Sequence, residues 1–435
     1  MSDTDFDAIV VGAGLAGPVA ALELARAGKS VLVVERGNFA GAKNMTGGRL
    51  YVHSLRNVFT DDELADAPFE RKIVRERISL MAPDATTTTI DFSSDAMNGE
   101  ETASYSVLRA PFDQWLAAKA EDAGAEFIYG IPVEGLVKDE GGKARGIRAG
   151  EDEITAEVVI LCDGVNSLLA REAVGYEKPP ASQMAVGVKE VLELPAGTIT
   201  DRILAQSDDE GAAWLFAGDA THGIFGGGFM YTNRDSISLG VVAGIEALAC
   251  SDAAPVYQML EDLKHHPAVA PVIRGAKVVE YSGHMVPEGG FDIMPELVGD
   301  GVMLAGDSAM MCLNLGYMVR GMDYAIAAGQ IAGQSAARAI DAGDTSASGL
   351  KGYAASLNGS FVMKDLRQYK NEPAFLEGFT RMFNEYPELA RDVLNDMFIV
   401  DGAPATPIKQ KIMPRLKQIG MLNILRDARG AMRAL

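Results

Sequence analysis

Apolar positions near the N-terminus form two continuous runs that flank a helical segment. FDAIVVGAG (6–14) and KSVLVVERG (29–37) are rich in β-branched residues, and the stretch between them (14–28) has the composition of a helix that ends at Gly28. Runs that are apolar throughout, instead of alternating, are typical of strands buried on both faces of a parallel sheet. The pattern therefore predicts a βαβ unit of about thirty residues.

The rest of the chain alternates between segments typical of buried strands, segments typical of antiparallel strands, and helical segments. Residues 40–60 are rich in Gly and small polar residues and predict a long functional loop, whereas 71–109 is β-like. Short strands punctuated by Gly between 184 and 245 predict an antiparallel sheet in a separate domain. AEVVILCDGVNS (156–167) and GDGVMLAGDSA (299–309) return to the buried-strand pattern, and the chain beyond 350 is mainly helical in character.

These patterns predict an α/β fold with interleaved domains. A Rossmann-like domain with a parallel sheet takes residues 1–180, with an inserted β segment at 60–110, and residues 291–345. Residues 181–290 form the antiparallel-sheet domain, and 346–435 form a helical C-terminal region.

The first strand runs into a G-x-G-x-x-G motif, Gly12 to Gly17, which opens the predicted helix. Gly12 permits a tight turn, Gly14 lets backbone N–H groups approach a pyrophosphate, and Gly17 permits close packing of helix on strand. Glu35 follows eighteen residues after Gly17, at the end of the next strand, where a carboxylate accepts hydrogen bonds from ribose hydroxyls. No second motif of this kind follows, which leaves one tightly held dinucleotide, NAD or FAD.

Charge and cysteine content narrow the function classes. The net charge of −21 disfavours nucleic acid as a partner. Three scattered cysteines, Cys162, Cys250 and Cys312, argue against a disulfide framework and fit a reducing cytoplasm. We expect neither a signal peptide nor a transmembrane helix, because no apolar run is long enough to span a bilayer.

Residues 409–435 differ from the rest, with seven basic residues and one acid. Between these basic residues, Ile408, Ile412, Leu416, Ile419 and Leu422 recur at helical spacing. Such a segment fits an anionic membrane surface, an acidic partner subunit or a packed helix with a solvated basic face, and the sequence leaves these readings open.

Several motifs resemble the glutathione-reductase-type FAD-binding superfamily. Glu35-Arg36-Gly37 resembles its second-strand ending, and Arg109 in SVLRAPFDQWL resembles the arginine that approaches the FAD pyrophosphate. Asp307 after Gly306 resembles the aspartate that binds the ribityl chain, and LCDGVNS, with Asp163 and Gly164, resembles the DG motif. Where the hydroxylases of this superfamily carry an arginine, the chain has Ala170, which disfavours a hydroxylase.

Longer stretches resemble the FixC proteins of the electron-transfer-flavoprotein:quinone oxidoreductase family. They are GAKNMTGGRLY (41–51), YSVLRAPFDQWL (105–116), AVGVKE (185–190), GGGFMYTN (226–233), HPAVAPVI (266–273) and the segment 295–329. The resemblance implies FAD as cofactor, electrons from an electron-transfer flavoprotein of the FixA and FixB type, and quinone as acceptor. It also implies a ferredoxin-like FixX-type subunit, since a cubane cluster needs about four cysteines, and in some relatives electron bifurcation.

We expect the flavin to carry the redox chemistry, with no catalytic acid–base pair in the protein. Candidates for the flavin-ring environment are Asn44, Thr46, Gly47, Gly48 and Arg49, with Arg49 offsetting negative charge on reduced flavin. A helix predicted to start near Gly316 would direct its N-terminal N–H groups at the ring, with Arg320 and Asp323 on the same segment.

Two other readings share the fold and the cofactor motifs. One is a prenyl reductase or monooxygenase that acts on a small molecule, and the other is a subunit that holds FAD without turnover. The expected location is the cytoplasm. The basic segment at 409–435 further suggests peripheral contact with the inner face of the cell membrane.

Overall fold

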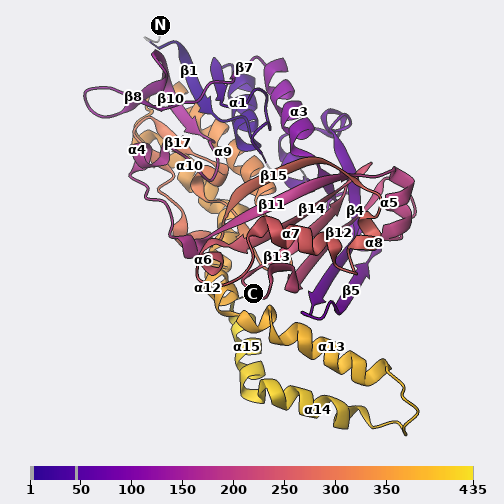
Figure 1. The fold of residues 1–435 in the computed structure, drawn as a ribbon. Helices are drawn as coiled ribbons and strands as arrows, with labels where there is room; N and C mark the ends of the chain where they lie inside the picture. Colours follow the sequence, from indigo (N-terminus) through magenta and orange to yellow (C-terminus); the bar gives the residue numbers. More distant parts are fainter. Residues whose placement is uncertain (1–3, 45–47, 435) are drawn as a thin grey trace.

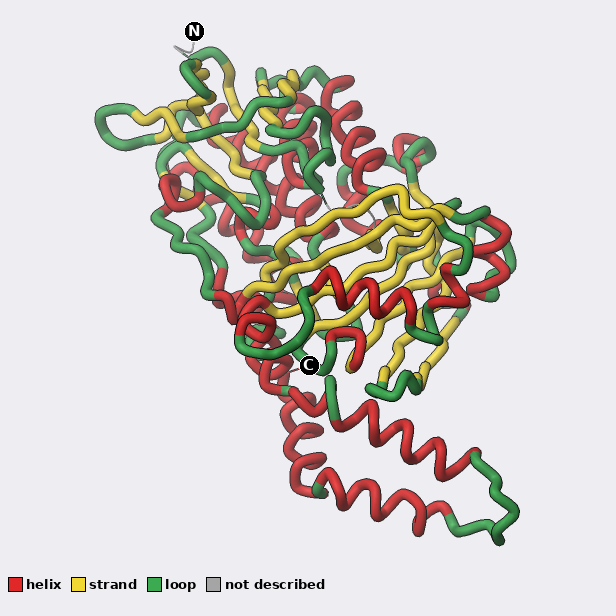
Figure 2. The backbone as a smooth tube through the Cα atoms, in the orientation of Figure 1, coloured by secondary structure: helices red, strands yellow, loops and turns green. Residues whose placement is uncertain are grey.

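The computed structural model describes residues 4–44 and 48–434 (Figure 1). Two β-sheets lie side by side, and helices from distant parts of the sequence cover the first (Figure 2). A helical arm from the C-terminal region projects away from both (Figure 1). The α/β class predicted from the sequence is confirmed.

The first sheet is mainly parallel and is buried on both faces. Val10 pairs with Val33 of the neighbouring strand on one side and with Ile160 on the other, and all three side chains are fully buried. The apolar runs thus form the buried strands that their pattern predicts. The strands along the sheet are β16 (Val298–Gly299), β17 (Val302–Leu304), β10 (Asp152–Leu161), β1 (Phe6–Val11), β2 (Val31–Glu35) and β7 (Glu126–Tyr129). Off this order, β9 (Ala144–Ala149) pairs with β10, and β8 (Gly135–Lys138) pairs with β9.

Small residues bring two helices of this domain unusually close together. A Cβ on Gly329 would lie 2.3 Å from the Ala16 carbonyl oxygen, and one on Gly333 would lie 2.4 Å from that of Ala20. The Ala- and Gly-rich segment 325–340 is therefore a helix whose small residues let it press on the first helix. The helices of this region are α1 (Ala16–Arg26), α2 (Asp61–Leu64), α3 (Arg109–Asp122), α4 (Ala170–Val174), α9 (Met322–Asp341) and α10 (Ala347–Gly359).

The second sheet is antiparallel apart from one parallel pair, β12 with β4. It takes strands from the segment 60–110 as well as from 181–290, because β4 pairs with β12 from Lys72 to Met81. In spatial order its strands are β15 (Lys277–Pro287), β11 (Met184–Glu193), β14 (Ser236–Gly244), β13 (Gly226–Thr232), β12 (Glu210–Gly218), β4 (Phe69–Met81), β6 (Ser104–Val107) and β3 (Gly48–Tyr51), with β5 (Thr87–Ser93) beside β4.

One face of this sheet is covered and the other is half-open. Trp214, Phe216, Leu239 and Val241 are buried in a second core. The helices that accompany this sheet are α5 (Ala196–Ile203), α6 (Ile245–Ala249), α7 (Val256–His265) and α8 (Ala270–Ile273). Figure 1 shows α7 lying across the strands. The opposite face carries half-buried side chains, among them Glu76, Ile78, Leu215 and Phe229. The division into domains stays a prediction.

The predicted long loop at 40–60 is wrong for its second half. Residues 48–51 form β3, which pairs with β6, and Val52–Asn57 form a 3-10 helix. Leu50, Val52 and Leu55 are buried in the main core. Burial of these three apolar side chains outweighs the local loop propensity of the surrounding small residues.

The helix predicted to start near Gly316 is also wrong, because α9 begins at Met322. Residues 313–320 form a small hairpin of β18 (Leu313–Asn314) and β19 (Val319–Arg320). Gly316 lies in its turn with φ +78°, a left-handed conformation that glycine adopts without strain.

The C-terminal region consists of helices, as predicted. These helices are α11 (Phe361–Gln368), α12 (Glu372–Gly378), α13 (Glu385–Phe398), α14 (Ile408–Ile419) and α15 (Met421–Ala434). The last three helices, α13 to α15 (residues 385–434), form the arm (Figure 1). Within this region Arg381 donates to Asp427 of α15. Asn384 Nδ2, at the start of α13, donates to the Gly223 carbonyl oxygen at 2.9 Å, and this bond ties the arm to the second sheet. In the described part of the chain, no helix is both long and apolar enough to cross a membrane.

Candidate cofactor site

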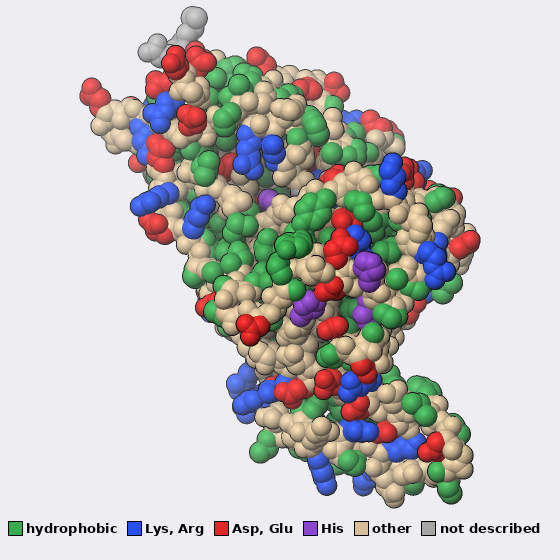
Figure 3. All heavy atoms as spheres, in the orientation of Figure 1, with side chains coloured by type: hydrophobic (Ala, Val, Ile, Leu, Met, Phe, Trp, Pro, Cys, Tyr) green, Lys and Arg blue, Asp and Glu red, His purple; other side chains and the backbone are tan. Residues whose placement is uncertain are grey.

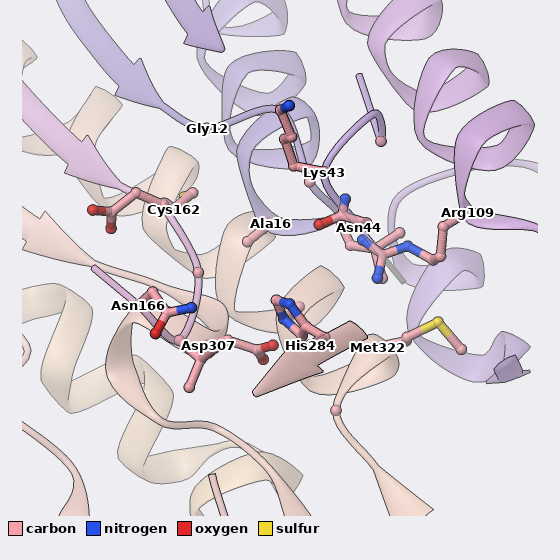
Figure 4. A pocket seen from close by; sticks show the side chains of 18 of the residues that line it. Gly12, Ala16, Lys43, Asn44, Arg109, Cys162, Asn166, His284, Asp307 and Met322 are labelled. Atoms are coloured by element: carbon pink, nitrogen blue, oxygen red, sulfur yellow. The ribbon is translucent and has the colours of Figure 1, made fainter. Parts of the chain in front are cut away.

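A cavity of about 440 Å³ lies between the two sheets and is lined by residues of both. This volume is within the range of small-molecule and cofactor sites, about 300–1,000 Å³. Its first-sheet wall includes Gly12, Gly14 and Glu35, and its second-sheet wall includes Arg49 and Tyr231. Figure 4 shows how side chains from several segments converge on it.

The turn between β1 and α1 forms a cradle open to the cavity. Gly12 has φ +101°, and a Cβ there would lie 2.4 Å from the Cys162 carbonyl oxygen, so only glycine fits. A Cβ on Gly14 would point into the cavity, 3.6 Å from Asn44 and 3.7 Å from Arg109. In the described structure no side chain caps α1, so its first N–H groups remain available to an anion.

Gly17 acts from behind the cradle. A Cβ there would lie 1.9 Å from the Gly12 carbonyl oxygen. The helix can therefore start this close to the turn only because position 17 has no side chain, as the motif predicts.

Glu35 braces the cradle from the end of β2. One carboxylate oxygen accepts from the Ala13 N–H at 2.8 Å and the other from the Gly37 N–H at 2.6 Å. The side chain lines the cavity while almost fully buried. It thus links the first turn to the second strand of the βαβ unit.

A buried carboxylate orients two polar side chains toward Gly14. Asp113 accepts from Arg109 Nε and NH2, both at 2.9 Å, and from the side-chain amide of Asn44. Asp113 is fully buried, and burial raises the pKa of its carboxyl while Arg109 and Asn44 oppose the shift. Figure 4 shows Asn44 and Arg109 next to each other at the cavity. Asp113 is absent from the sequence-based candidates, although its spacing of four from Arg109 on α3 was a usable signal.

Two further acids, Asp163 and Asp307, line the cavity, and one of them has a buried oxygen without a described partner. Asp163 Oδ2 accepts from Ser167 Oγ at 2.9 Å, whereas no described residue hydrogen-bonds to its buried Oδ1. Burial raises the pKa of Asp163 to about 6, and burial raises that of Asp307 to about 6 against the effect of Arg109. A buried acceptor without a partner, as at Asp163, fits a ligand that brings a hydroxyl donor.

The second-sheet wall carries a cation and aromatic side chains. Arg49 donates from Nε to Ser104 Oγ at 2.9 Å, pairs with Glu76, and lies over the Tyr51 ring at 4.8 Å. His284, from β15, also lines the cavity and was not among the sequence candidates. Burial and the charges of Arg109 and Arg36 lower the pKa of His284, which favours the neutral imidazole.

Most of the residues singled out from the sequence meet at this cavity. Those that line it are Gly12, Gly14, Glu35, Arg36, Asn44, Gly48, Arg49, Arg109, Asp163, Gly164 and Asp307. Gly306 packs behind it, where a Cβ would meet Ala16 at 3.1 Å. Gly316 lies away from the lining, next to Leu376, and Thr46 and Gly47 lie outside the described residues.

Metal chemistry finds no support in the part of the chain described. No group of three or more His, Cys, Asp or Glu side chains is arranged there to hold an ion. Cys162 and Cys312 are buried and Cys250 is exposed, and all three are free thiols.

Two protein-family models match the chain, one over its N-terminal half and one at its C-terminus. Residues 5–212 match a model described as an FAD binding domain, and residues 372–435 match the ETF-QO/FixC family C-terminal domain. The first match covers the βαβ unit and most of the cavity lining, and it supports FAD as the dinucleotide.

Curated relatives match over nearly the full length. Protein FixC of Escherichia coli K12 is 50% identical over 434 residues, covering 98% of each chain. A probable electron transfer flavoprotein-quinone oxidoreductase of the same organism, YdiS, is 50% identical over 427 residues, again covering 98% of each.

Solved structures share the fold at low identity. A geranylgeranyl bacteriochlorophyll reductase-like protein of Thermoplasma acidophilum has a TM-score of 0.68 at 19% identity, covering 98% of this chain and 99% of that one. A flavoprotein/dehydrogenase of Cytophaga hutchinsonii has a TM-score of 0.64 at 16% identity, covering 98% and 99%.

Proposed function

Because the chain belongs to the FixC family of electron transfer flavoprotein-quinone oxidoreductases, we propose that it takes electrons from an electron-transfer flavoprotein, through bound FAD, and passes them to a quinone. The observation that carries this proposal is the cavity between the sheets. Its lining joins the dinucleotide cradle of the first sheet to residues of the second sheet, so a cofactor held by the cradle would lie against the second-sheet wall.

FAD supplies the redox chemistry when it is bound, by accepting and releasing two electrons. The residues present fit it. Gly14, the start of α1 and the Arg109 guanidinium would hold the pyrophosphate, and Glu35 would accept from the adenosine ribose. Asp307 would accept from the ribityl hydroxyls, which explains an acid in the cavity lining whose pKa burial raises to about 6.

Asp113 offers a direct test of this assignment. Replacing it with Ala frees Arg109 and Asn44 and removes a hydrogen-bonded partner of both, so we expect the Kd for FAD to rise about ten- to a hundredfold. Titration of the FAD-free protein with FAD, followed by flavin fluorescence, measures this. The control is Asp122→Ala on the same helix, an exposed carboxylate that should leave the Kd unchanged. If Asp113→Ala bound FAD as tightly as the wild type, Arg109 as oriented by Asp113 would not contribute to FAD binding.

The alternative, a prenyl reductase or monooxygenase, shares the fold but differs in its donor. The proposed function predicts that a reduced electron-transfer flavoprotein supports quinone reduction, whereas NADPH alone bleaches the bound flavin slowly or not at all. Reduction by NADPH alone, coupled to a small-molecule product, would support the alternative instead. The solved structures that resemble the chain show the fold only and do not decide between the two.

An iron–sulfur partner is a further part of the proposal. A cubane cluster needs about four thiolates, and the three cysteines of this chain lie far apart in sequence. We therefore place any cluster on a separate ferredoxin-like subunit, and a complex of that kind is the form in which electron bifurcation would occur. Co-purification of flavoprotein subunits with a small iron–sulfur protein tests this.

The arm supports peripheral membrane contact. At its far end Phe398, Ile399 and Val400 are 73%, 66% and 88% exposed, and α15 exposes Leu422 and Leu425 among basic residues. Figure 3 shows hydrophobic and basic side chains together on the arm. Ile412, Leu416 and Ile419 of the predicted stripe are only half-exposed, so the tip presents more apolar surface than α14 itself.

We expect the triple variant Phe398→Ser, Ile399→Ser, Val400→Ser to lose at least tenfold in affinity for vesicles containing phosphatidylglycerol, since each side chain loses apolar area that the interface would bury. Vesicle co-sedimentation measures this. Val278→Ser with Val279→Ser on β15, which are 45% and 51% exposed, serves as the control. Unchanged sedimentation of the triple variant would exclude the tip as the membrane contact.

A further inference from the structure

The half-open face of the second sheet continues from the cavity, and on its β4 side it carries Glu76 between two uncharged neighbours. Glu76 of β4 is in register with Ala213 of β12, which is in register with Tyr231 of β13. Partners in register point to the same face of a sheet. Glu76 and Tyr231 therefore share the face that meets the cavity, where Tyr231 forms part of the lining.

The next row on this face is apolar. Ile90 of β5 is in register with Ile78 of β4, then Leu215 of β12 and Phe229 of β13. Ile90 is 66% exposed, whereas the other three are half-buried. The row thus leads from solvent to β13, the strand whose Tyr231 lines the cavity. We call these four residues the apolar row.

The apolar row begins close to where the arm joins the sheet. Arg391 of α13 pairs with Asp84, in the turn between β4 and β5, at 3.2 Å. A molecule that arrives along the arm would meet this row before it reached the cavity. Glu76 and Tyr231 lie two residues from Ile78 and Phe229 on the same strands, so they form a polar row beside the apolar one. This pairing suits a ring with carbonyl groups and an apolar tail.

Arg49 holds Glu76 in place. It forms an ion pair with Glu76, donates to Ser104 and lies over Tyr51, and the Arg49 and Glu76 side chains are 17% and 26% exposed. The residues in register with Glu76 on its neighbouring strands, Phe92 and Ala213, carry no charge. Glu76 therefore keeps a path to water while its main charged neighbour is Arg49.

We infer that Glu76 delivers a proton to a quinone bound at the second-sheet wall, with the Tyr231 hydroxyl donating a hydrogen bond to a quinone carbonyl. Arg49 is a positioning residue that orients Glu76 and offsets its charge after the transfer. This inference rests on the proposed function and adds the acceptor side of the site to it.

The transfer balances as follows. The quinone gains two electrons and one proton from the reduced cofactor and its second proton from the Glu76 carboxyl, so both carbonyls become hydroxyls. Glu76 then regains its proton from water. Burial supports this role, because it raises the pKa of Glu76 above the usual value against the opposing effect of Arg49. Burial also raises the pKa of Tyr231, which keeps the phenol protonated as a donor.

The test separates the two half-reactions. Wild-type FAD-loaded protein and Glu76→Gln are reduced anaerobically with dithionite, mixed with a short-chain ubiquinone, and followed by the return of flavin absorbance between pH 5 and 9. We expect the rate in Glu76→Gln to be about a hundredfold lower and independent of pH, as for loss of a general acid. In the wild type we expect the rate to fall as pH rises through the pKa of Glu76, and Glu76→Asp to recover part of it.

Two readouts exclude a merely structural effect. Binding of the same quinone to the oxidised protein, measured by quenching of flavin fluorescence, should weaken about tenfold in Tyr231→Phe and stay near wild type in Glu76→Gln. Glu157→Gln is the matched control, since Glu157 pairs with Arg145 at 3.0 Å and is also 26% exposed, but lies on the first sheet. It should leave both measurements unchanged.

The outcomes are distinct. A wild-type rate and pH profile in Glu76→Gln would overturn the inference while leaving the proposed function intact. A wild-type protein whose reduced flavin is not reoxidised by any quinone would overturn the proposed function itself.

Discussion

Gly17→Val is expected to abolish FAD binding. A Cβ at position 17 would lie 1.9 Å from the Gly12 carbonyl oxygen, which is backbone and cannot rotate away. Gly12 is itself fixed by φ +101° and by the nearby Cys162 carbonyl. The only relief is to push α1 away from β1, and that movement removes the N–H groups of the cradle from the position that an incoming pyrophosphate needs.

The expected loss is at least a hundredfold in affinity, because overpacking against fixed backbone costs about 3 kcal/mol or more. The ratio of FAD to protein after purification, from absorbance at 450 and 280 nm, gives a first measure, and titration with FAD gives the Kd. Gly352→Ala is the control: it lies within α10 with open space around its Cβ position, and should leave FAD content unchanged. A Gly17→Val protein with full FAD content would contradict the cradle described above.

Arg71→Met is expected to destabilise the second sheet by about 3–5 kcal/mol, the range for breaking a buried charged network. Arg71 is fully buried on β4. Its guanidinium donates to five acceptors: the carbonyl oxygens of Ala196, Glu210, Asn233 and Arg234, and Thr200 Oγ1, at 2.7–3.1 Å. Met matches the apolar part of the side chain but leaves these acceptors without their donor.

Unfolding by urea, followed by tryptophan fluorescence from Trp214 in this sheet, measures the effect. Arg75→Met is the control, because Arg75 is on the same strand but its pair with Asp91 is partly exposed and should contribute less than about 1 kcal/mol. Equal midpoints for Arg71→Met and wild type would show that this network contributes nothing to the fold.

Local signals explain what the sequence could predict. Gly12, Gly14 and Gly17 constrain the backbone within a few residues, and Glu35 follows at the end of the adjacent strand, so the cradle was visible in one short segment. Continuous apolar runs likewise identified β1, β2 and β10, because their burial depends on pattern and not on a particular partner. These predictions needed no long-range contact.

The remaining parts of the site depend on register between distant strands. Glu76 and Tyr231 share one face only because β4 pairs with β12 and β12 with β13. Glu76 lies in no stretch that carries the family resemblance, and Tyr231 lies in one (226–233) that gives no indication of which side chain faces a ligand, so neither is a candidate from the sequence. Two boundaries differ from the prediction for a related reason. The loop at 40–60 ends early because β3 pairs with β6. The helix α9 starts late because Leu313 pairs with Arg320 in a small hairpin.

The central claim is that one FAD, held between the sheets, connects a flavoprotein donor to a quinone acceptor. The most direct measurement is an anaerobic experiment in which the FAD-loaded protein receives a catalytic amount of electron-transfer flavoprotein, together with one equivalent of a reductant that reduces only that flavoprotein, and then quinone. The account predicts that the absorbance at 450 nm of one FAD per chain falls when flavoprotein and reductant are present together and returns when quinone is added. A flavin that keeps its oxidised spectrum throughout, in a protein that carries FAD, would contradict it.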